Sequence, residues 1–268
     1  MDKQIILLLL LIVITSGCLE EIGLDQDDEL PNRGLEIESY SVTDSELRPN
    51  QQAVIRAEFR NYHRDIEVEN IELTNYGTLL SVEPQGCTPD IENLEGARDG
   101  IQPTMACTWV VEAPEEDEME GFNERREPVQ MRVEYRASME NTDPLRVNFR
   151  PVEEIEATNV VSQSSSNGEV SLRLASDNPA TLQAGTDLEV IADNDGPGRL
   201  PEGFSFNFEP RRLFSDCEDG KSEEGLQDDE VSFLCSVTAD SEGTNNIFVS
   251  LDYKYVKEPT LDVTLVNR

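Results

Sequence analysis

Hydrophobic and polar residues alternate along most of the chain. The alternation is clear in Ile55-x-Ala57-x-Phe59, Val129-x-Met131-x-Val133 and Leu145-x-Val147-x-Phe149. A period of two residues is expected for β-strands that bury one face. Turn-forming sequences such as Asn178-Pro179 and Asp195-Gly196-Pro197-Gly198 separate these segments. Beyond residue 18 no stretch sustains a helical period, so the pattern predicts an all-β protein.

The alternating segments occur twice in the same order. Ile55-x-Ala57 matches Leu188-x-Val190, and Met105-x-Cys107-x-Trp109 matches Phe233-x-Cys235-x-Val237. Further matches pair Val129-x-Met131-x-Val133-x-Tyr135 with Ile247-x-Val249-x-Leu251-x-Tyr253, and Leu145-x-Val147-x-Phe149 with Leu261-x-Val263-x-Leu265. The offset between the copies falls steadily from 133 to 116 residues along the chain, as shorter loops in the second copy would produce. The chain therefore reads as a tandem duplication.

Each copy has the size of an immunoglobulin-like β-sandwich, which needs about seven short strands in roughly 100 residues. We expect two such sandwiches in tandem, at residues 35–150 and 169–268, joined by a linker at 151–168. Residues 1–17 are expected to form a signal peptide, and residues 18–34 an acidic tether.

The N-terminus has the pattern of an export signal. Ten apolar residues, Ile5 to Ile14, precede Ser16-Gly17-Cys18. As a helix this run is about 15 Å long, half the thickness of a bilayer core, so it is too short to span. Ser16-Gly17-Cys18 resembles the lipobox of prokaryotic lipoproteins, which implies lipidation of Cys18. The alternative is an ordinary signal peptide with a chance cysteine.

The other four cysteines form two sequential pairs, Cys87 with Cys107 and Cys217 with Cys235. Four cysteines allow three connectivities, and their places in the repeat favour one disulfide within each copy. A zinc site is the rival interpretation, but no C-x-x-C spacing occurs and the chain has one histidine, His63.

The charge composition indicates the environment in which the protein works. The chain has 268 residues with 56 acids and 21 bases, a net charge of −35. Only four bases are lysines, and acid excess with scarce lysine resembles proteins of halophilic archaea, in which concentrated salt screens the repulsion. A surface this acidic repels phosphate backbones, which excludes nucleic acid as a general partner. An acidic disordered chain is the alternative, and the strand pattern opposes it.

Two of the matched strands end in asparagine, at Asn61 and Asn194, and each is followed by a turn and another alternating strand. This resembles the adhesion-related immunoglobulin-like modules of bacterial and archaeal surface proteins. The resemblance implies surface display and interaction, and it supplies no catalytic residues.

Candidates for chemistry are few. His63 is the only side chain that could serve a Ser–His pair, and Asn61-Tyr62-His63-Arg64 reads as a polar surface turn. Paired carboxylates for glycoside cleavage cannot be singled out among 56 acids. Asp193-x-Asp195-Gly196 hints at a calcium loop, although a β-turn explains it equally well. We expect no catalytic residue, no metal site and no cofactor.

The sequence thus favours a non-catalytic interaction or structural protein of the cell envelope. It would be lipid-anchored on the extracellular face of the membrane through Cys18, with an unidentified envelope or surface protein as partner. The alternative is an envelope ligand-binding lipoprotein or hydrolase with an unrecognised site.

Overall fold

A computed structural model describes residues 34–215, 217 and 230–267. The signal peptide, Cys18 and all but the last residue of the tether lie outside these residues. The described residues form strands and four short 3-10 helices, with no α-helix. None of their helices has the length and hydrophobicity needed to cross a membrane. The all-β prediction is confirmed, with two immunoglobulin-like sandwiches in tandem.

The first sandwich has one purely antiparallel sheet of four strands. Its order is β1 (Leu35–Val42), β3 (Gln52–Asn61), β6 (Thr104–Glu112) and β5 (Ser81–Thr88). Burial alternates along β3, where Ala53, Ile55, Ala57 and Phe59 face the core. The 3-10 helices η1 (Ile91–Asn93) and η2 (Asp117–Met119) lie in its loops.

The second sandwich has a corresponding sheet of five strands. Its order is β14 (Phe214–Ser215), β15 (Glu230–Val237), β12 (Thr186–Asn194), β10 (Val170–Asn178) and β9 (Asn159–Ser166). The 3-10 helix η3 (Val152–Glu154) precedes β9 in sequence, and η4 (Arg211–Leu213) directly precedes β14.

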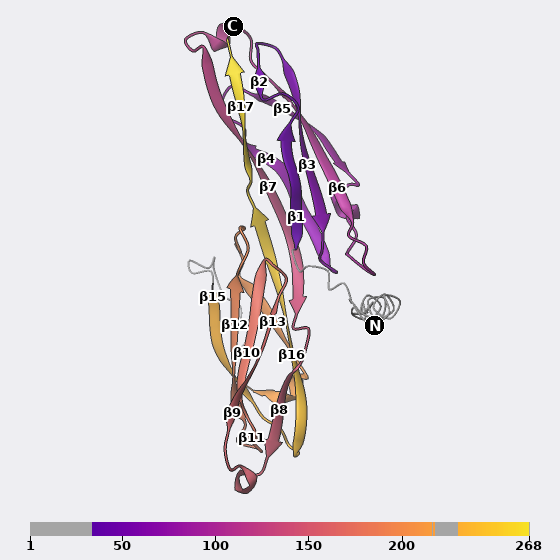
Figure 1. Cartoon of the computed structure of the whole chain (residues 1–268), viewed down its shortest axis with the longest axis vertical. Coiled ribbons are helices and arrows are strands. Elements are labelled where there is room, and N and C mark those ends of the chain that lie inside the picture. Colours follow the sequence, from indigo (N-terminus) through magenta and orange to yellow (C-terminus); the bar gives the residue numbers. More distant parts are fainter. Residues whose placement is uncertain (1–33, 216, 218–229, 268) are drawn as a thin grey trace, which may run out of the picture. The chain divides into compact units, whose positions relative to one another are not determined.

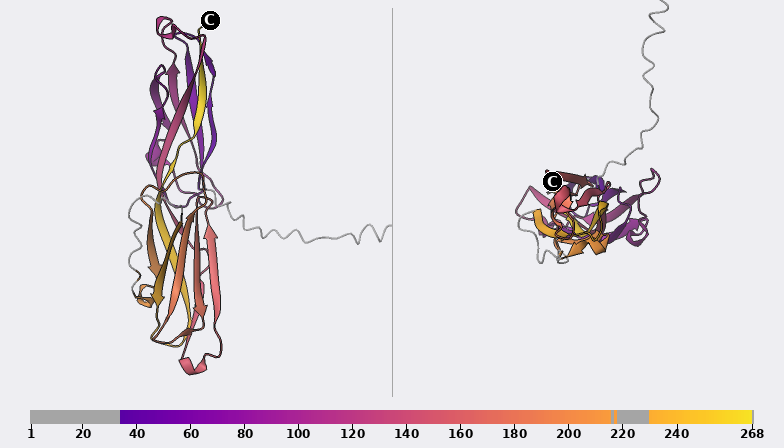
Figure 2. Two further views of the ribbon diagram at one scale, coloured as in Figure 1. Left: turned by 90° about the vertical axis from the view of Figure 1, so that its left-hand side faces the viewer. Right: turned by 90° about the horizontal axis from the view of Figure 1, so that it is seen from below.

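A third sheet is shared by both sandwiches. Its order is β11 (Ala180–Thr181), β8 (Leu145–Arg150), β16 (Gly243–Lys257), β7 (Glu124–Glu140), β17 (Thr260–Val266) and β2 (Glu46–Leu47). In addition, β4 (Ile66–Asn75) pairs with β7, and β13 (Phe204–Glu209) pairs with β16. Figures 1 and 2 show β7 and β16 passing from one sandwich into the other.

The two long strands and their successors form one ribbon, which we call the central ribbon (residues 124–150 and 243–266). β7 and β16 pair with each other at their C-terminal ends, with Tyr135 opposite Tyr255. Beyond that overlap, β8 continues along β16, with Leu145 opposite Ile247, and β17 continues along β7, with Leu261 opposite Val129. The sequence repeat matches each of these two pairings with the other. The two halves of the ribbon are therefore related by a pseudo-twofold axis. This axis lies near Arg136 and Lys254, which are opposite each other.

The strand pairing differs from the expected boundaries at three places. β8, expected in the first sandwich, pairs with β16 and β11 of the second. β17, expected in the second, pairs with β7 and β2 of the first. Residues 159–166 of the expected linker form β9, which pairs with β10. An alternating pattern shows that a segment is a strand with one buried face, but it carries no information about its partner.

The repeat alignment also needs a local shift. It matched Cys107 with Cys235. In the structure Trp109 lies opposite Ile55, and Cys235 lies opposite Leu188, the residue that matches Ile55. Cys235 therefore has the position of Trp109, two residues farther along the strand.

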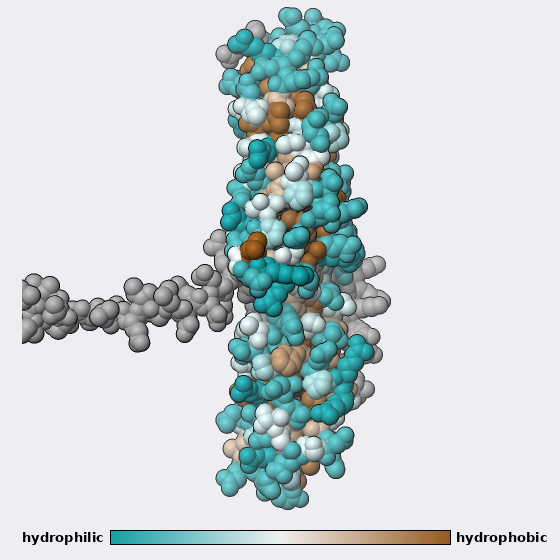
Figure 3. Space-filling view, turned by 90° about the vertical axis from the view of Figure 1, so that its right-hand side faces the viewer, coloured by the Kyte–Doolittle hydropathy of each residue, from teal (hydrophilic) through white to brown (hydrophobic). Residues whose placement is uncertain are grey.

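The face shown in Figure 3 is largely hydrophilic, with hydrophobic side chains scattered over it. This agrees with the high proportion of charged residues in the chain.

Candidate functional site

A buried carboxylate lies where the two sandwiches meet. Glu169 belongs to the tight turn between β9 and β10, and its side chain is 1% exposed. Around it lie Tyr135 of β7, and Tyr253 and Lys257 of β16. His63, in the loop after β3, completes the group, which we call the Glu169 cluster.

Five donors converge on this one carboxylate. Oε1 accepts a hydrogen bond from the Leu35 N–H at 3.1 Å and lies 2.7 Å from Lys257 Nζ. The Tyr135 hydroxyl donates to the same oxygen. Oε2 lies 2.9 Å from His63 Nε2 and 3.2 Å from the Tyr253 hydroxyl. A buried charge is tolerated when it is paired and hydrogen-bonded in this way.

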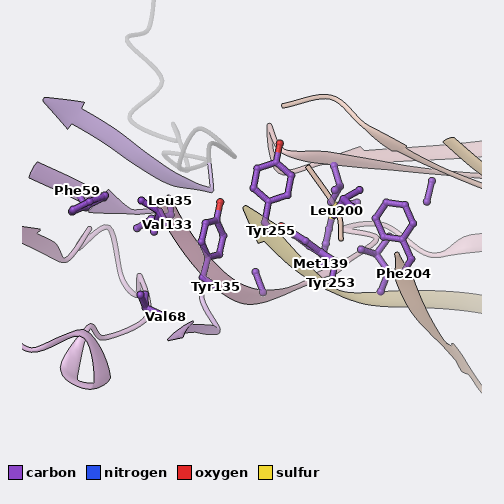
Figure 4. Close-up of a cluster of buried hydrophobic side chains, with 14 of the residues drawn as sticks. Leu35, Phe59, Val68, Val133, Tyr135, Met139, Leu200, Phe204, Tyr253 and Tyr255 are labelled. Carbon is purple, nitrogen blue, oxygen red and sulfur yellow. The ribbon is translucent and has the colours of Figure 1, made fainter. Parts of the chain in front are cut away.

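Aromatic rings surround the ammonium group of Lys257. Its Nζ lies 5.9 Å from the centre of the Tyr135 ring and 5.6 Å from that of Tyr255. Figure 4 shows these two rings side by side on β7 and β16, near Leu35 and Val133. Lys257 also donates to the Leu35 carbonyl at 2.5 Å, so both backbone polar groups of Leu35 are held by the cluster.

Asparagine side chains shape the backbone that presents the cluster. The side-chain oxygen Oδ1 of Asn61 accepts a hydrogen bond from the backbone N–H of His63 at 2.9 Å. Its side-chain Nδ2 donates to the backbone carbonyl of Glu95 at 2.8 Å. Asn194, at the matching end of β12, donates to the Gly198 carbonyl at 2.8 Å and accepts from the Tyr255 hydroxyl at 2.9 Å. The prediction that asparagine ends both strands before a turn is confirmed, and the turns are those beside the cluster.

Two further residues fit the Glu169 turn closely. The Asn167 carbonyl accepts from the N–H groups of Glu169 and Val170, at 3.1 and 3.0 Å. Gly34 has a φ of +67°, and a Cβ there would lie 2.0 Å from the Glu169 carboxyl carbon. Only glycine meets both the backbone and the space requirement at this position.

The electrostatics of the cluster keep Glu169 ionised. Burial raises its pKa, but the His63 hydrogen bond and charge, together with Lys257, outweigh burial and lower the pKa to about 2. Burial also raises the pKa of the Tyr135 and Tyr253 hydroxyls, and the charge of Glu169 adds to this. The tyrosines therefore remain neutral donors to the carboxylate.

The position of His63 corrects the expectation of a surface turn. Its side chain is 3% exposed, and its Nε2 is engaged by Glu169. The sequence context of Asn61, Tyr62 and Arg64 is polar, but Glu169, 106 residues away, supplies the buried partner that stabilises the ring inside. A buried histidine whose Nε2 contacts a carboxylate is not accessible to a substrate.

A second set of charges lies on the outward face of the central ribbon. Lys254 Nζ lies 2.7 Å from a Glu69 oxygen and 2.9 Å from a Glu134 oxygen. Arg136 contacts Glu69 at 2.6 Å and Glu202 at 2.8 Å. These hydrogen bonds lower the pKa values of Glu69 and Glu134, although partial burial acts in the opposite direction.

Beside these charges is a cavity of about 880 Å³, which we call the ribbon groove. Arg136, Ser138, Asp252 and Lys254 of the ribbon line it. Residues 64–67 with Gly96 and Arg98 contribute from the first sandwich, and residues 201–205 from the second.

The predicted cysteine pairs lie at disulfide-bonding distance. Cys87 and Cys107 are directly opposite on β5 and β6, with their Cα atoms 4.0 Å apart. The Cα atoms of Cys217 and Cys235 are 4.8 Å apart. Cys107 and Cys235 are buried in the core. In the part of the chain that the structure describes, no three His, Cys, Asp or Glu side chains form a group suited to a metal ion, Asp193 and Asp195 included.

Sequence reasoning missed Glu169 and the two lysines of β16. Glu169 is one of 56 acids, and its neighbours Asn167-Gly168 read as an ordinary turn. A usable signal was the scarcity of lysine, because two of the four lysines, Lys254 and Lys257, lie within four residues of each other.

Comparison with known proteins identifies no family for this chain. No protein-family model and no curated protein matches the chain. Among solved structures, a collagen adhesin from S. aureus is similar over 86% of this chain and 92% of its own, with 7% identity and a TM-score of 0.19.

Proposed function

We propose that the protein is a non-catalytic interaction or structural protein of the cell envelope, tethered to the outer face of the membrane through Cys18. The observation that carries the non-catalytic part is the Glu169 cluster. It contains the only histidine of the chain, and both His63 and Glu169 are sealed from solvent and satisfied by each other. The buried ionisable groups thus stabilise the junction of the two sandwiches.

The tethering part rests on the sequence. Ser16-Gly17-Cys18 follows a short apolar run, and the acidic residues after Cys18 suit a solvated spacer. Stable anchoring requires more than one lipid chain, which a diacylated cysteine supplies. The charge of −35 gives no attraction to an anionic membrane surface.

The test is expression of the full chain in a halophilic archaeal host, followed by cell fractionation and protease treatment of intact cells. The chain should fractionate with membranes and be digested from outside. Cys18→Ala should block maturation or release the protein into the medium. Cys87→Ala is the matched control and should do neither.

Mature protein that begins elsewhere, or that remains on the membrane without Cys18, would contradict the tether. Chemical cross-linking on the same cells tests the interaction role. One envelope protein should be recovered repeatedly with wild-type chain and should be lost when the chain is released by Cys18→Ala. Recovery of no reproducible partner would contradict it.

The alternative function, a ligand-binding lipoprotein, is favoured by one specific observation. The ribbon groove lies between two domains, where ligand sites commonly occur, and its volume is within the usual range of roughly 300–1,000 Å³.

A further inference from the structure

We propose that the ribbon groove binds an acidic oligosaccharide, a glycan chain carrying uronic-acid carboxylates. This inference deepens the proposed surface role, on which it rests, by naming a ligand class for one site. Its support comes from the charges of the groove, the rigidity of the wall that carries them, and the type of acceptors beside them.

The lining of the groove is less acidic than the chain as a whole, although Glu69 and Glu134 also pair with its cations. Four basic side chains line it, Arg64, Arg98, Arg136 and Lys254, against four acidic ones, Asp65, Glu67, Glu202 and Asp252. The whole chain carries 56 acids and 21 bases, so this balance is a local concentration of cations. An anion approaching the protein meets less repulsion here than a typical acidic surface would offer.

The cations have two different roles. Arg136 and Lys254 are held by Glu69, Glu134 and Glu202. Arg64 and Arg98 are exposed and make no side-chain ion pair with any described residue. Their guanidinium groups are available for a ligand, and the planar fork of arginine matches a carboxylate.

The wall that carries these two arginines is rigid. The Ala97 N–H donates to the His63 carbonyl at 2.7 Å, which joins the two loops. A Cβ on Gly96 would lie 1.7 Å from the Arg64 carbonyl oxygen, so the loops approach as closely as glycine permits. Arg98 opens a tight turn with positive φ at Asp99 and Gly100, closed by paired backbone bonds to Ile101. His63, next to Arg64, is fixed in turn by Glu169.

The acidic side chains of the groove decide the ligand class. Asp65, Glu67 and Asp252 are exposed, and ionised carboxylates only accept hydrogen bonds. They repel the carboxylates of a peptide and of a uronate alike, but a sugar also has hydroxyl groups that can donate hydrogen bonds to them, which Asp and Glu side chains lack. Ile66 and Pro201, both partly exposed, add apolar surface for the C–H faces of sugar rings. A chain that bears both hydroxyls and carboxylates fits both halves of this lining.

The experiment measures binding to the full chain in detergent micelles by calorimetry, in about 1 M KCl to screen the non-specific repulsion between the acidic chain and the anionic probes. The probes are trigalacturonate, neutral maltotriose and triglutamate. The variants are Arg64→Gln, Arg98→Gln and the double variant, with Arg146→Gln as control. Arg146 is exposed on β8 and does not line the groove.

Trigalacturonate should bind best, each single variant should weaken it at least about tenfold, and Arg146→Gln should not change it. Equal or tighter binding of triglutamate would overturn the glycan in favour of an acidic peptide. Equal binding of maltotriose, or an equal loss with Arg146→Gln, would overturn the role of Arg64 and Arg98. If none of the probes binds, the groove proposal fails, whereas the envelope role stands or falls on fractionation and cross-linking.

Discussion

At the scale of single residues, Glu169 has the largest predicted effect on stability. It accepts from both sandwiches, through Leu35 and His63 on one side and Tyr253 and Lys257 on the other. Its side chain is 1% exposed, so water cannot take the place of a hydrogen-bond partner that is removed by substitution. Removing its charge therefore leaves the largely buried ammonium group of Lys257 without its counter-charge, which costs free energy.

We predict that Glu169→Gln lowers the free energy of unfolding by about 3–5 kcal/mol, the usual cost of breaking a buried ion pair. Urea denaturation followed by fluorescence measures this. Glu72→Gln is the matched control, because Glu72 is exposed on β4, and it should change stability by less than about 0.5 kcal/mol. A loss as small as that of the control would show that Glu169 does not stabilise the junction.

The pH dependence has a definite sign. The pKa of Glu169 is lowered to about 2 in the folded protein, from 4.5, so its contribution is present above pH 4.5 and is lost as pH falls towards 2. At 1.36 kcal/mol per pH unit this amounts to roughly 3 kcal/mol. The wild type should therefore lose more stability than Glu169→Gln between pH 5 and 2, as measured by urea midpoints. Parallel curves for the two proteins would contradict the assignment.

At the scale of elements, the central ribbon connects the sandwiches more firmly than a linker does. Residues 124–150 pair with residues 243–266 through two equivalent registers. Each half of the chain supplies a strand to the sheet of the other, β8 in one direction and β17 in the other.

Cutting the connection between β8 and β9 should therefore leave the two halves together. A protease site inserted at residues 155–158, which are largely exposed, would allow cleavage of the folded chain. The fragments should co-elute in size-exclusion chromatography and separate only in denaturant. The close cysteine pairs do not link the halves, since each lies within one fragment. Fragments that separate under native conditions would mean that the sandwiches are independent.

The sequence predicted strands well and their partners poorly, for a physical reason. Period-2 burial identified β3, β7 and β16 because each buries one face of a sheet. β8 pairs within the second sandwich and β17 within the first, the reverse of their order in the chain. Pairing in either sandwich would bury the same alternate residues, so the sequence pattern does not distinguish the two arrangements. The Glu169 cluster was missed for a related reason, because its contacts join residues as far as 222 positions apart, Leu35 and Lys257, and only the fold brings them together.

At the scale of the whole molecule, net charge governs the conditions for folding. Among the described residues the only lysines are Lys254 and Lys257, both on β16 and both ion-paired at the junction. Much of the remaining acid excess is on the surface, where mutual repulsion opposes compaction.

We predict that thermal stability rises strongly between about 0.1 M and 2 M KCl, because the Debye length falls from about 10 Å to below 3 Å over that range. Calorimetric melts of the full chain in detergent check this. Glu169→Gln should show a similar salt dependence, since buried pairs are screened much less than surface charges. A melting temperature that is flat across the range would contradict the halophilic interpretation.

The exchange of β17 also has a consequence for biosynthesis. β17 belongs to the first sandwich but is made after the whole of the second, so the sheet formed by β7 stays incomplete during most of translation and export. The edge of β7 that β17 later covers would meanwhile be open to pairing with other chains. Folding of this protein is therefore expected to finish only after residue 266 has been synthesised, and chaperones that shield open strand edges would matter most in that interval.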